Sequence, residues 1–140
     1  MRVLYFGTYE RDYPRNAQVI SCLRRAGVTV TERHMPVWDG RRDNWSAGIG
    51  AAARLAAAEL RLLKPPEAEF DALLVGYPGQ FDLPAARLAA RGRPIVFNPL
   101  VSLSDTFVAD RGRFRSGSAA ARMLEAIDRR ALRAANLVVA

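Results

Sequence analysis

Short apolar runs alternate with helical stretches along this chain of 140 residues. The runs lie at residues 3–6, 28–33, 71–76, 94–97 and 136–140, and segments with apolar residues at helical spacing separate them at 17–26, 47–64, 83–91 and 118–135. This alternation is typical of a parallel sheet covered by helices, in which ligands bind beyond the carboxyl ends of the strands. We therefore predict an α/β fold: a Rossmann-like open parallel sheet of about five strands, in the order 3-2-1-4-5, with helices on both faces.

The helical segments also have predicted ends and predicted buried faces. Gly27 and Gly92 are expected to end the first and third helices, and Ser46 and Asp82 to cap the second and third. The helix at 17–26 is expected to bury Cys22 as a small apolar side chain. The helix at 47–64 is expected to bury an apolar face made of Ile49, Ala52, Ala53, Ala56, Leu60 and Leu63.

Length and composition fit a single domain spanning residues 1–140. About half of the residues are apolar, which is enough to build a core at this size. No apolar run reaches the roughly 20 residues of a membrane span, and the first residues lack a signal-peptide pattern. We therefore predict a cytoplasmic location.

The charge of the chain predicts an anionic partner. The formal net charge is +7, and Lys64 is the only lysine among 21 basic residues. Phosphates, nucleotide sugars and acidic lipid surfaces all fit this charge. Nucleic acid does not fit, because the arginines are scattered and no recognition helix, zinc pattern or aromatic RNA-binding motif is present. On the helix at 47–64, Arg54, Arg61 and Lys64 form a basic stripe that suits either solvent or a peripheral contact with a membrane.

The loop that follows the first strand is polar and long, with the sequence GTYERDYPRN from Gly7 to Asn16. It lacks the second and third glycines of a G-x-G-x-x-G turn, which argues against NAD or FAD. The chain also lacks a phosphate-loop motif, a G-x-S-x-G elbow and a His and Cys cluster with metal spacing. We therefore expect no cofactor and no metal, and we expect Arg11 and Arg15 to hold anions near a helix N-terminus.

Four segments carry a resemblance to a known family. They are MRVLYFGTY at the start, FDALLVGYPGQFD in the middle, RPIVFNPLVSLSD after it and RRALRAANLVVA at the end. Together they resemble the N-terminal domain of GT-B fold, family 4-type glycosyltransferases over the whole chain. The resemblance implies an acceptor-side domain, truncated before the C-terminal domain that holds most of the nucleotide-sugar donor.

The resemblance also assigns candidate site residues. Gly7 and Thr8 match the first loop of the family, which approaches the donor phosphates, although Thr8 stands where relatives often have a second glycine. Asp105 lies where many relatives have a His or Asp near the acceptor hydroxyl, so it is the candidate general base; a turn cap is its alternative role. Tyr77 and Gln80 follow a strand and are either acceptor-facing or part of a plain turn. His34, the sole histidine, is a weaker candidate for the base.

Two functional hypotheses follow from these observations. In the first, the chain contributes acceptor binding and part of the cleft for sugar transfer from a nucleotide sugar to a hydroxyl acceptor, including a lipid-linked one, and is inactive alone. Its partner is then either a complementary C-terminal half or a second copy in a homodimer. In the second, the chain is a non-catalytic, flavodoxin-like module that binds a nucleotide or a protein through its basic surface.

Overall fold

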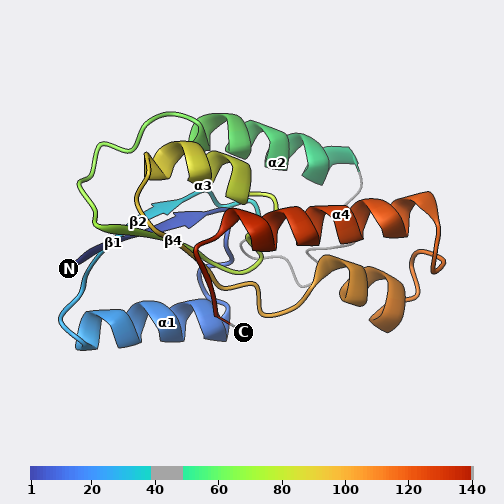
Figure 1. The fold of residues 1–140 in the computed structure, drawn as a ribbon, viewed down its shortest axis with the longest axis horizontal. Helices are drawn as coiled ribbons and strands as arrows, with labels where there is room; N and C mark the ends of the chain where they lie inside the picture. Colours follow the sequence, from blue (N-terminus) through green and yellow to red (C-terminus); the bar gives the residue numbers. More distant parts are fainter. Residues whose placement is uncertain (39–48, 140) are drawn as a thin grey trace.

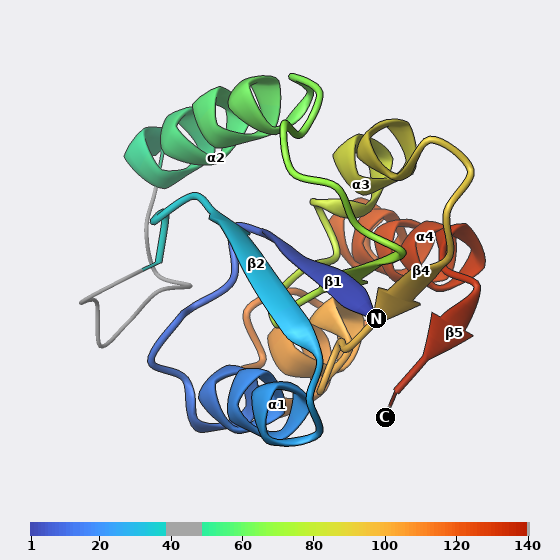
Figure 2. The same ribbon diagram turned by 90° about the vertical axis from the view of Figure 1, so that its left-hand side faces the viewer.

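The fold is a single parallel sheet with helices on both faces. The structure is a computed structural model that describes residues 1–38 and 49–139. Its strands are β1 (Arg2–Gly7), β2 (Thr29–His34), β3 (Ala72–Val75), β4 (Ile95–Phe97) and β5 (Leu137–Val138). They form one sheet in the order β2-β1-β3-β4-β5, and all neighbouring pairs are parallel. Figure 2 shows β2 and β5 at opposite edges of this sheet. The predicted fold class is confirmed.

The predicted strand order 3-2-1-4-5 is wrong. Strand β3 pairs with β1 and not with β2, so the chain crosses over β1 between β2 and β3. The reason is visible in the burial of the strands. All of β1 after Arg2 is buried, whereas β2 exposes Thr29 and Thr31 and is an edge strand. The reversal of direction therefore falls between β1 and β3, which is where open α/β sheets form their ligand crevice.

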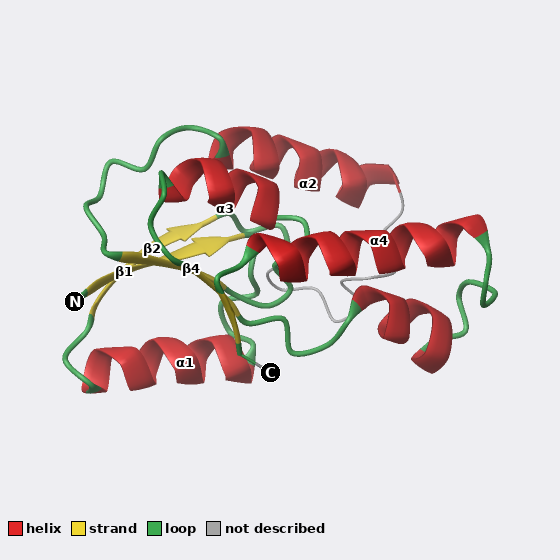
Figure 3. Ribbon diagram, viewed as in Figure 1, coloured by secondary structure: helices red, strands yellow, loops and turns green. Residues whose placement is uncertain are grey.

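The helices divide unequally between the two faces of the sheet. They are α1 (Pro14–Arg25), α2 (Ile49–Leu62), α3 (Leu83–Ala90) and α4 (Ala119–Ala134), together with a short π-helix, η1 (Asp105–Asp110). Helix α1 covers one face, and α2, α3 and α4 cover the other (Figures 1 and 3). This arrangement follows from right-handed crossovers on either side of β1. No helix is predicted from the sequence at the position of η1.

Local sequence signals explain where several helices begin and end. Pro14 occupies the first turn of α1, where its missing N–H costs nothing. The Ser118 hydroxyl accepts a hydrogen bond from the Ala121 N–H at 3.2 Å and caps α4. Gly27 and Gly92 have positive φ just beyond α1 and α3, as expected of residues that end a helix. The predicted cap Ser46 lies outside the described residues.

An apolar core lies on each face of the sheet and holds the layers together. The larger one lies between the sheet and α2, α3 and α4, and includes Leu4, Phe6 and Phe97. The second one lies under α1 and includes Tyr5 and Ile20. Alternate residues of β1 thus point to opposite cores, as the two-residue period of a strand requires.

The predicted buried face of the second helix is wrong. Helix α2 buries Ala51, Ala58 and Leu62, whereas Leu60 is 68% exposed. The buried face also carries Glu59, a polar residue that the apolar pattern assigned to solvent. The basic stripe of Arg54, Arg61 and Lys64 is exposed.

Cys22 is exposed, so the prediction that it is buried is also wrong. Helix α1 turns Asn16 and Ile20 toward the sheet, and Cys22 lies about 200° around the helix from Ile20. Within residues 1–38 and 49–139, no helix combines the length and the apolar character that a membrane crossing requires.

Candidate functional site

The buried side chain of Asn16 joins the loops that follow β1 and β3. Its Nδ2 group donates hydrogen bonds to the Tyr77 carbonyl at 2.6 Å and to the Glu10 carbonyl at 2.7 Å. Its Oδ1 atom accepts from the Tyr77 N–H at 3.0 Å and from the Tyr5 hydroxyl at 2.9 Å. Asn16 therefore fixes the relative position of the two loops that border the crevice between β1 and β3.

We expect Asn16→Ala to lower the free energy of unfolding by about 3 kcal/mol, because it leaves the buried Tyr77 N–H and Tyr5 hydroxyl without their acceptor. Urea unfolding measures the loss. Gln18→Ala is the matched control, since Gln18 is exposed on the same helix and should cost less than about 0.5 kcal/mol. Equal losses in the two variants would contradict this role for Asn16.

Thr8 and Asp82 form a buried contact at the end of β1. The Thr8 N–H donates to Asp82 Oδ2 at 2.7 Å, and the Thr8 hydroxyl donates to Asp82 Oδ1 at 2.9 Å. The Trp38 indole N–H donates to the Thr8 hydroxyl at 3.2 Å. Asp82 is the N-cap residue of α3, as predicted, but its side chain makes no capping hydrogen bond to the helix. The N–H group and hydroxyl that Thr8 could offer to an anion are thus engaged by an internal carboxylate.

Glu59 of α2 completes this buried group. Its carboxyl is hydrogen-bonded to Asp82, and burial together with that neighbouring carboxylate raises the pKa of Glu59 to about 10. Burial also raises the pKa of Asp82, although the hydrogen bonds from Glu59 and Thr8 oppose the shift. Two carboxyl groups so close cannot both ionise cheaply, so the pair holds one proton at neutral pH.

This pair makes stability depend on pH. Between about pH 4.5 and pH 10 the folded pair keeps a proton that the unfolded chain has released, so the free energy of unfolding falls as pH rises. We expect Glu59→Gln, which keeps a neutral side chain, to raise that free energy by about 1 to 2 kcal/mol at pH 8, after allowance for partial solvent access, and by little at pH 5. Urea unfolding at both pH values checks this. Glu125→Gln controls for the loss of a surface carboxylate, and an equal effect of Glu59→Gln at the two pH values would refute the shared proton.

Arg15 and Gln80 form hydrogen bonds to residues that follow β4 and β5, at the carboxyl edge of the sheet. Arg15 Nε donates to Asn98 Oδ1 at 2.8 Å, and Arg15 Nη2 donates to the Val139 carbonyl at 3.3 Å. Gln80 Nε2 donates to the Val101 carbonyl at 2.8 Å. These contacts bring the loop from Gly7 to Arg15 and the segment after β4 to one rim of the sheet, as the parallel strands require.

Tyr77 and Arg11 lie at different places on this rim. The Tyr77 ring is buried against Tyr13, with ring centres 4.9 Å apart. Arg11 lies at the β2 edge, where it pairs with Glu32 at 3.0 Å. His34 contacts the Tyr9 carbonyl through Nε2 at 2.8 Å, so that ring nitrogen is engaged within the protein.

Asp105 is exposed at the first position of η1. The start of this helix is held by Asp128 of α4, whose carboxylate accepts hydrogen bonds from the Leu103 and Ser104 N–H groups, both at 2.9 Å. A carboxylate at this end of a helix satisfies N–H groups that have no partner within the helix. Asp128 therefore fixes the helix that presents Asp105 to solvent.

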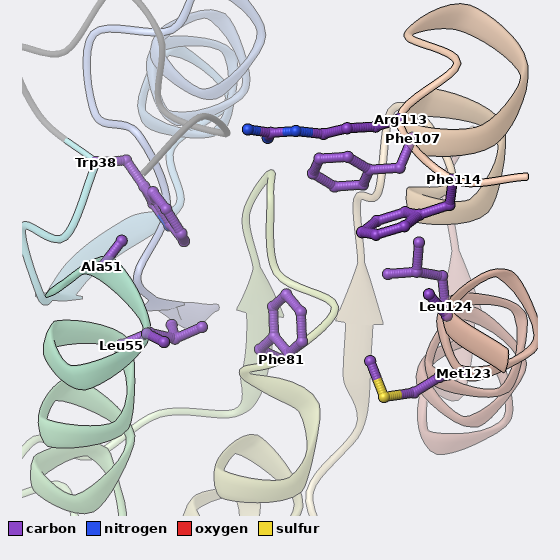
Figure 4. A pocket seen from close by; sticks show the side chains of 11 residues that line it. Trp38, Ala51, Leu55, Phe81, Phe107, Arg113, Phe114, Met123 and Leu124 are labelled. Atoms are coloured by element: carbon purple, nitrogen blue, oxygen red, sulfur yellow. The ribbon is translucent and has the colours of Figure 1, made fainter. Parts of the chain in front are cut away.

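An apolar pocket of about 290 Å³ lies between α2, η1 and α4 (Figure 4). Trp38 follows β2, Phe81 follows β3, and Phe107 belongs to the connection after β4, so the pocket lies at the carboxyl edge of the sheet. The other lining residues are Ala51, Ala52, Leu55, Arg113, Phe114, Ala120, Met123 and Leu124. We call this the α2–α4 pocket.

The structure brings some predicted site residues together and separates others. Gly7 ends β1, Arg15 lies in the first turn of α1, and Thr8, Tyr77 and Gln80 lie in loops at the same edge of the sheet, whereas Arg11 lies toward the outer strand β2. No sequence motif points to Asn16, Glu59, Asp128 or the residues of the α2–α4 pocket. Among residues 1–38 and 49–139, no three His, Cys, Asp or Glu side chains are grouped closely enough to hold a metal ion.

Comparison of the chain with protein-family models, with curated proteins and with solved structures gives no match. The family resemblance and the role of Asp105 therefore stay predictions.

Proposed function

We propose that this chain is the acceptor-side domain of a nucleotide-sugar-dependent glycosyltransferase. The observation that carries the proposal is that η1 contributes both to an apolar pocket and to an exposed carboxylate at the carboxyl edge of the sheet. Phe107 of η1 lines the α2–α4 pocket, and Asp105 begins the same helix. Sugar transfer to a hydroxyl needs a site for the acceptor and a group that can take its proton, and η1 contributes a candidate for each.

The contacts of Thr8 support the proposal that one domain binds the acceptor and another binds the nucleotide-sugar donor. Its N–H and hydroxyl groups bind Asp82, so this loop offers those donors to its own carboxylate and not to a diphosphate. The donor would then be held by a separate domain. In the proposed reaction, the acceptor oxygen bonds to the anomeric carbon, Asp105 takes the hydroxyl proton, and the bond to the nucleoside diphosphate breaks.

The test is transfer of label from a radioactive nucleotide sugar by the protein that carries this domain together with a donor-binding domain. Soluble hydroxyl compounds and extracted lipids serve as acceptors. Labelled product that depends on residues 1–140 supports the proposal. Turnover by the donor-binding domain alone at the same rate would refute it.

The strand order favours one other function. The order β2-β1-β3-β4-β5 is that of flavodoxin-like nucleotide-binding folds, whose ligand lies between β1 and β3. Titration with FMN and with nucleoside diphosphates separates the two proposals. A dissociation constant below about 10 μM for the chain alone would favour the nucleotide-binding module.

The glycosyltransferase proposal also includes a cytoplasmic location and a partner that covers the open part of the sheet face on which α1 lies. Leu137 pairs with Val96 in β5, at the edge of the sheet, and is 57% exposed. A complementary domain or a second copy would bury this apolar surface. The exposed basic stripe on α2 is the surface we propose for peripheral membrane contact, and light scattering reports whether the chain forms a homodimer.

A further inference from the structure

We propose that the α2–α4 pocket holds the hydrocarbon part of an amphiphilic acceptor whose phosphate group lies against the arginines that border it. This inference rests on the proposed function, because the hydroxyl of that amphiphile is the one to be glycosylated. It goes further by naming the chemistry of the acceptor: an alkyl or isoprenoid chain joined to an anionic head.

The described lining of the pocket suits a hydrocarbon chain better than a bare sugar. Four aromatic rings, from Trp38, Phe81, Phe107 and Phe114, reach it from different segments, and Arg113 is the only charged residue among the lining residues that the structure describes (Figure 4). A sugar buried there would leave most of its hydroxyl groups without partners, which is costly. A hydrocarbon chain loses no hydrogen bond on entry and gains about fourfold in affinity for each buried CH₂ group.

The mouth of the pocket is apolar as well. Met123 is 60% exposed and Phe114 is 38% exposed, although both line the pocket. Large apolar side chains that remain exposed together at a concave site mark a surface that a ligand covers. The hydrocarbon chain can therefore extend from the interior of the pocket over these two residues.

Basic residues lie next to the mouth residues in the sequence and favour an anionic head group. Residues 111–122 contain four arginines and no acidic residue. Arg111, Arg115 and Arg122 are exposed and form no salt bridge within the described part of the chain. They flank Phe114 and Met123 in the sequence. The head group of an amphiphile whose hydrocarbon chain is bound at those two residues would therefore lie close to arginine side chains. Arginine binds phosphate with particular strength because its planar donors match the phosphate oxygens.

The pocket favours a single molecule over a membrane surface. Trp38 lines it and is buried, so a ligand must enter the protein to reach this ring. A helix or loop that lies on a bilayer instead presents its apolar side chains outward. In the α2–α4 pocket, apolar side chains point outward only at the mouth, where Phe114 and Met123 are exposed.

Octyl phosphate, used below its micellar concentration, is the probe that tests the inference. Calorimetry and tryptophan fluorescence follow its binding to the whole chain, with octanol and inorganic phosphate as the two halves of the probe. We expect saturable binding of octyl phosphate, at least tenfold weaker binding of octanol and no detectable binding of inorganic phosphate at about 1 mM. Failure of octyl phosphate to bind at that concentration would overturn the inference.

Paired variants locate the site. Phe114→Asp and Met123→Asp place a charge at the mouth and should weaken octyl phosphate binding about tenfold or more, whereas Leu88→Asp, at an exposed apolar residue of α3, should not. Arg115→Ser should weaken binding of octyl phosphate but not of octanol, and Arg129→Ser on α4 is its control. Circular dichroism confirms that each variant folds. Equal effects of a mouth variant and its control would overturn the inference.

The remaining outcomes separate this inference from others. Binding to phosphatidylglycerol vesicles that Phe114→Asp and Met123→Asp leave unchanged, with no binding of monomeric octyl phosphate, would show membrane adsorption and overturn the pocket site. Octyl phosphate binding without any sugar transfer would refute the proposed function and leave the pocket site supported. Sugar transfer to soluble acceptors without octyl phosphate binding would refute this inference alone.

Discussion

Gly7→Ala is expected to lower the free energy of unfolding by about 4 kcal/mol or more, which is enough to unfold a large fraction of a domain of ordinary stability. Gly7 has a φ of +125°, a conformation that residues with a Cβ rarely adopt. A Cβ atom at this position would also overlap the carboxylate of Asp82. Because Asp82 is fully buried and bound to Thr8, it cannot move aside without losing both hydrogen bonds.

Gly27→Ala separates the two causes. Gly27 has a φ of +78°, but nothing lies within 4 Å of the place where a Cβ would be. We therefore expect it to cost only about 1 kcal/mol, from backbone strain alone. Urea unfolding of both variants measures the difference. If they lose equal stability, the contact between Gly7 and Asp82 has no energetic role.

A double-mutant cycle tests the contact directly. Asp82→Ala removes the carboxylate that a Cβ on residue 7 would meet, so Gly7→Ala should cost less in that background than in the native chain. An unchanged cost would place the strain elsewhere. The cycle also measures how much the carboxylate of Asp82 contributes to the free energy of unfolding through its contacts at the end of β1.

The fold class could be predicted because it depends on local periodicity. The apolar run at residues 71–76 and the helical spacing of apolar residues in α4 are both visible within short stretches of sequence. The alternation of such runs and helices is typical of a parallel sheet. The strand order could not be obtained in the same way, because it depends on which strands pair over long distances. One signal was present: β2 alternates Thr29 and Thr31 with valines, as an edge strand does, and an edge strand cannot lie between two others.

The candidate site was harder to predict because its polar residues are buried. Asn16, Glu59 and Asp128 look like surface residues in the sequence, but each faces a partner on another element. Their partners are 61 residues away for the Asn16 contact with Tyr77 and 25 away for the contact between Asp128 and Leu103. A single sequence carries no information on such pairs. Gly7 ends β1 and Gln80 follows β3, so a parallel sheet places both at the same edge, while their part in a functional site stays a prediction.

The exposed position of Asp105 leads to the second large prediction. In the enzyme that carries this domain, Asp105→Asn is expected to lower turnover about a hundredfold or more and to leave donor affinity nearly unchanged, because an amide cannot take the proton of the acceptor hydroxyl. Steady-state kinetics with a labelled nucleotide sugar measures both quantities. Asp110→Asn is the matched control, since Asp110 is an exposed carboxylate at the other end of η1.

Arg15→Ala distinguishes the loss of a base from the loss of binding. Arg15 holds Asn98 and the Val139 carbonyl at the rim of the sheet, so its removal should raise the KM for the acceptor more than it lowers turnover. Asp105→Asn should do the reverse. An Asp105→Asn enzyme with undiminished turnover would remove this carboxylate from the reaction, and its remaining role would be to begin η1, where Asp128 already holds the preceding N–H groups.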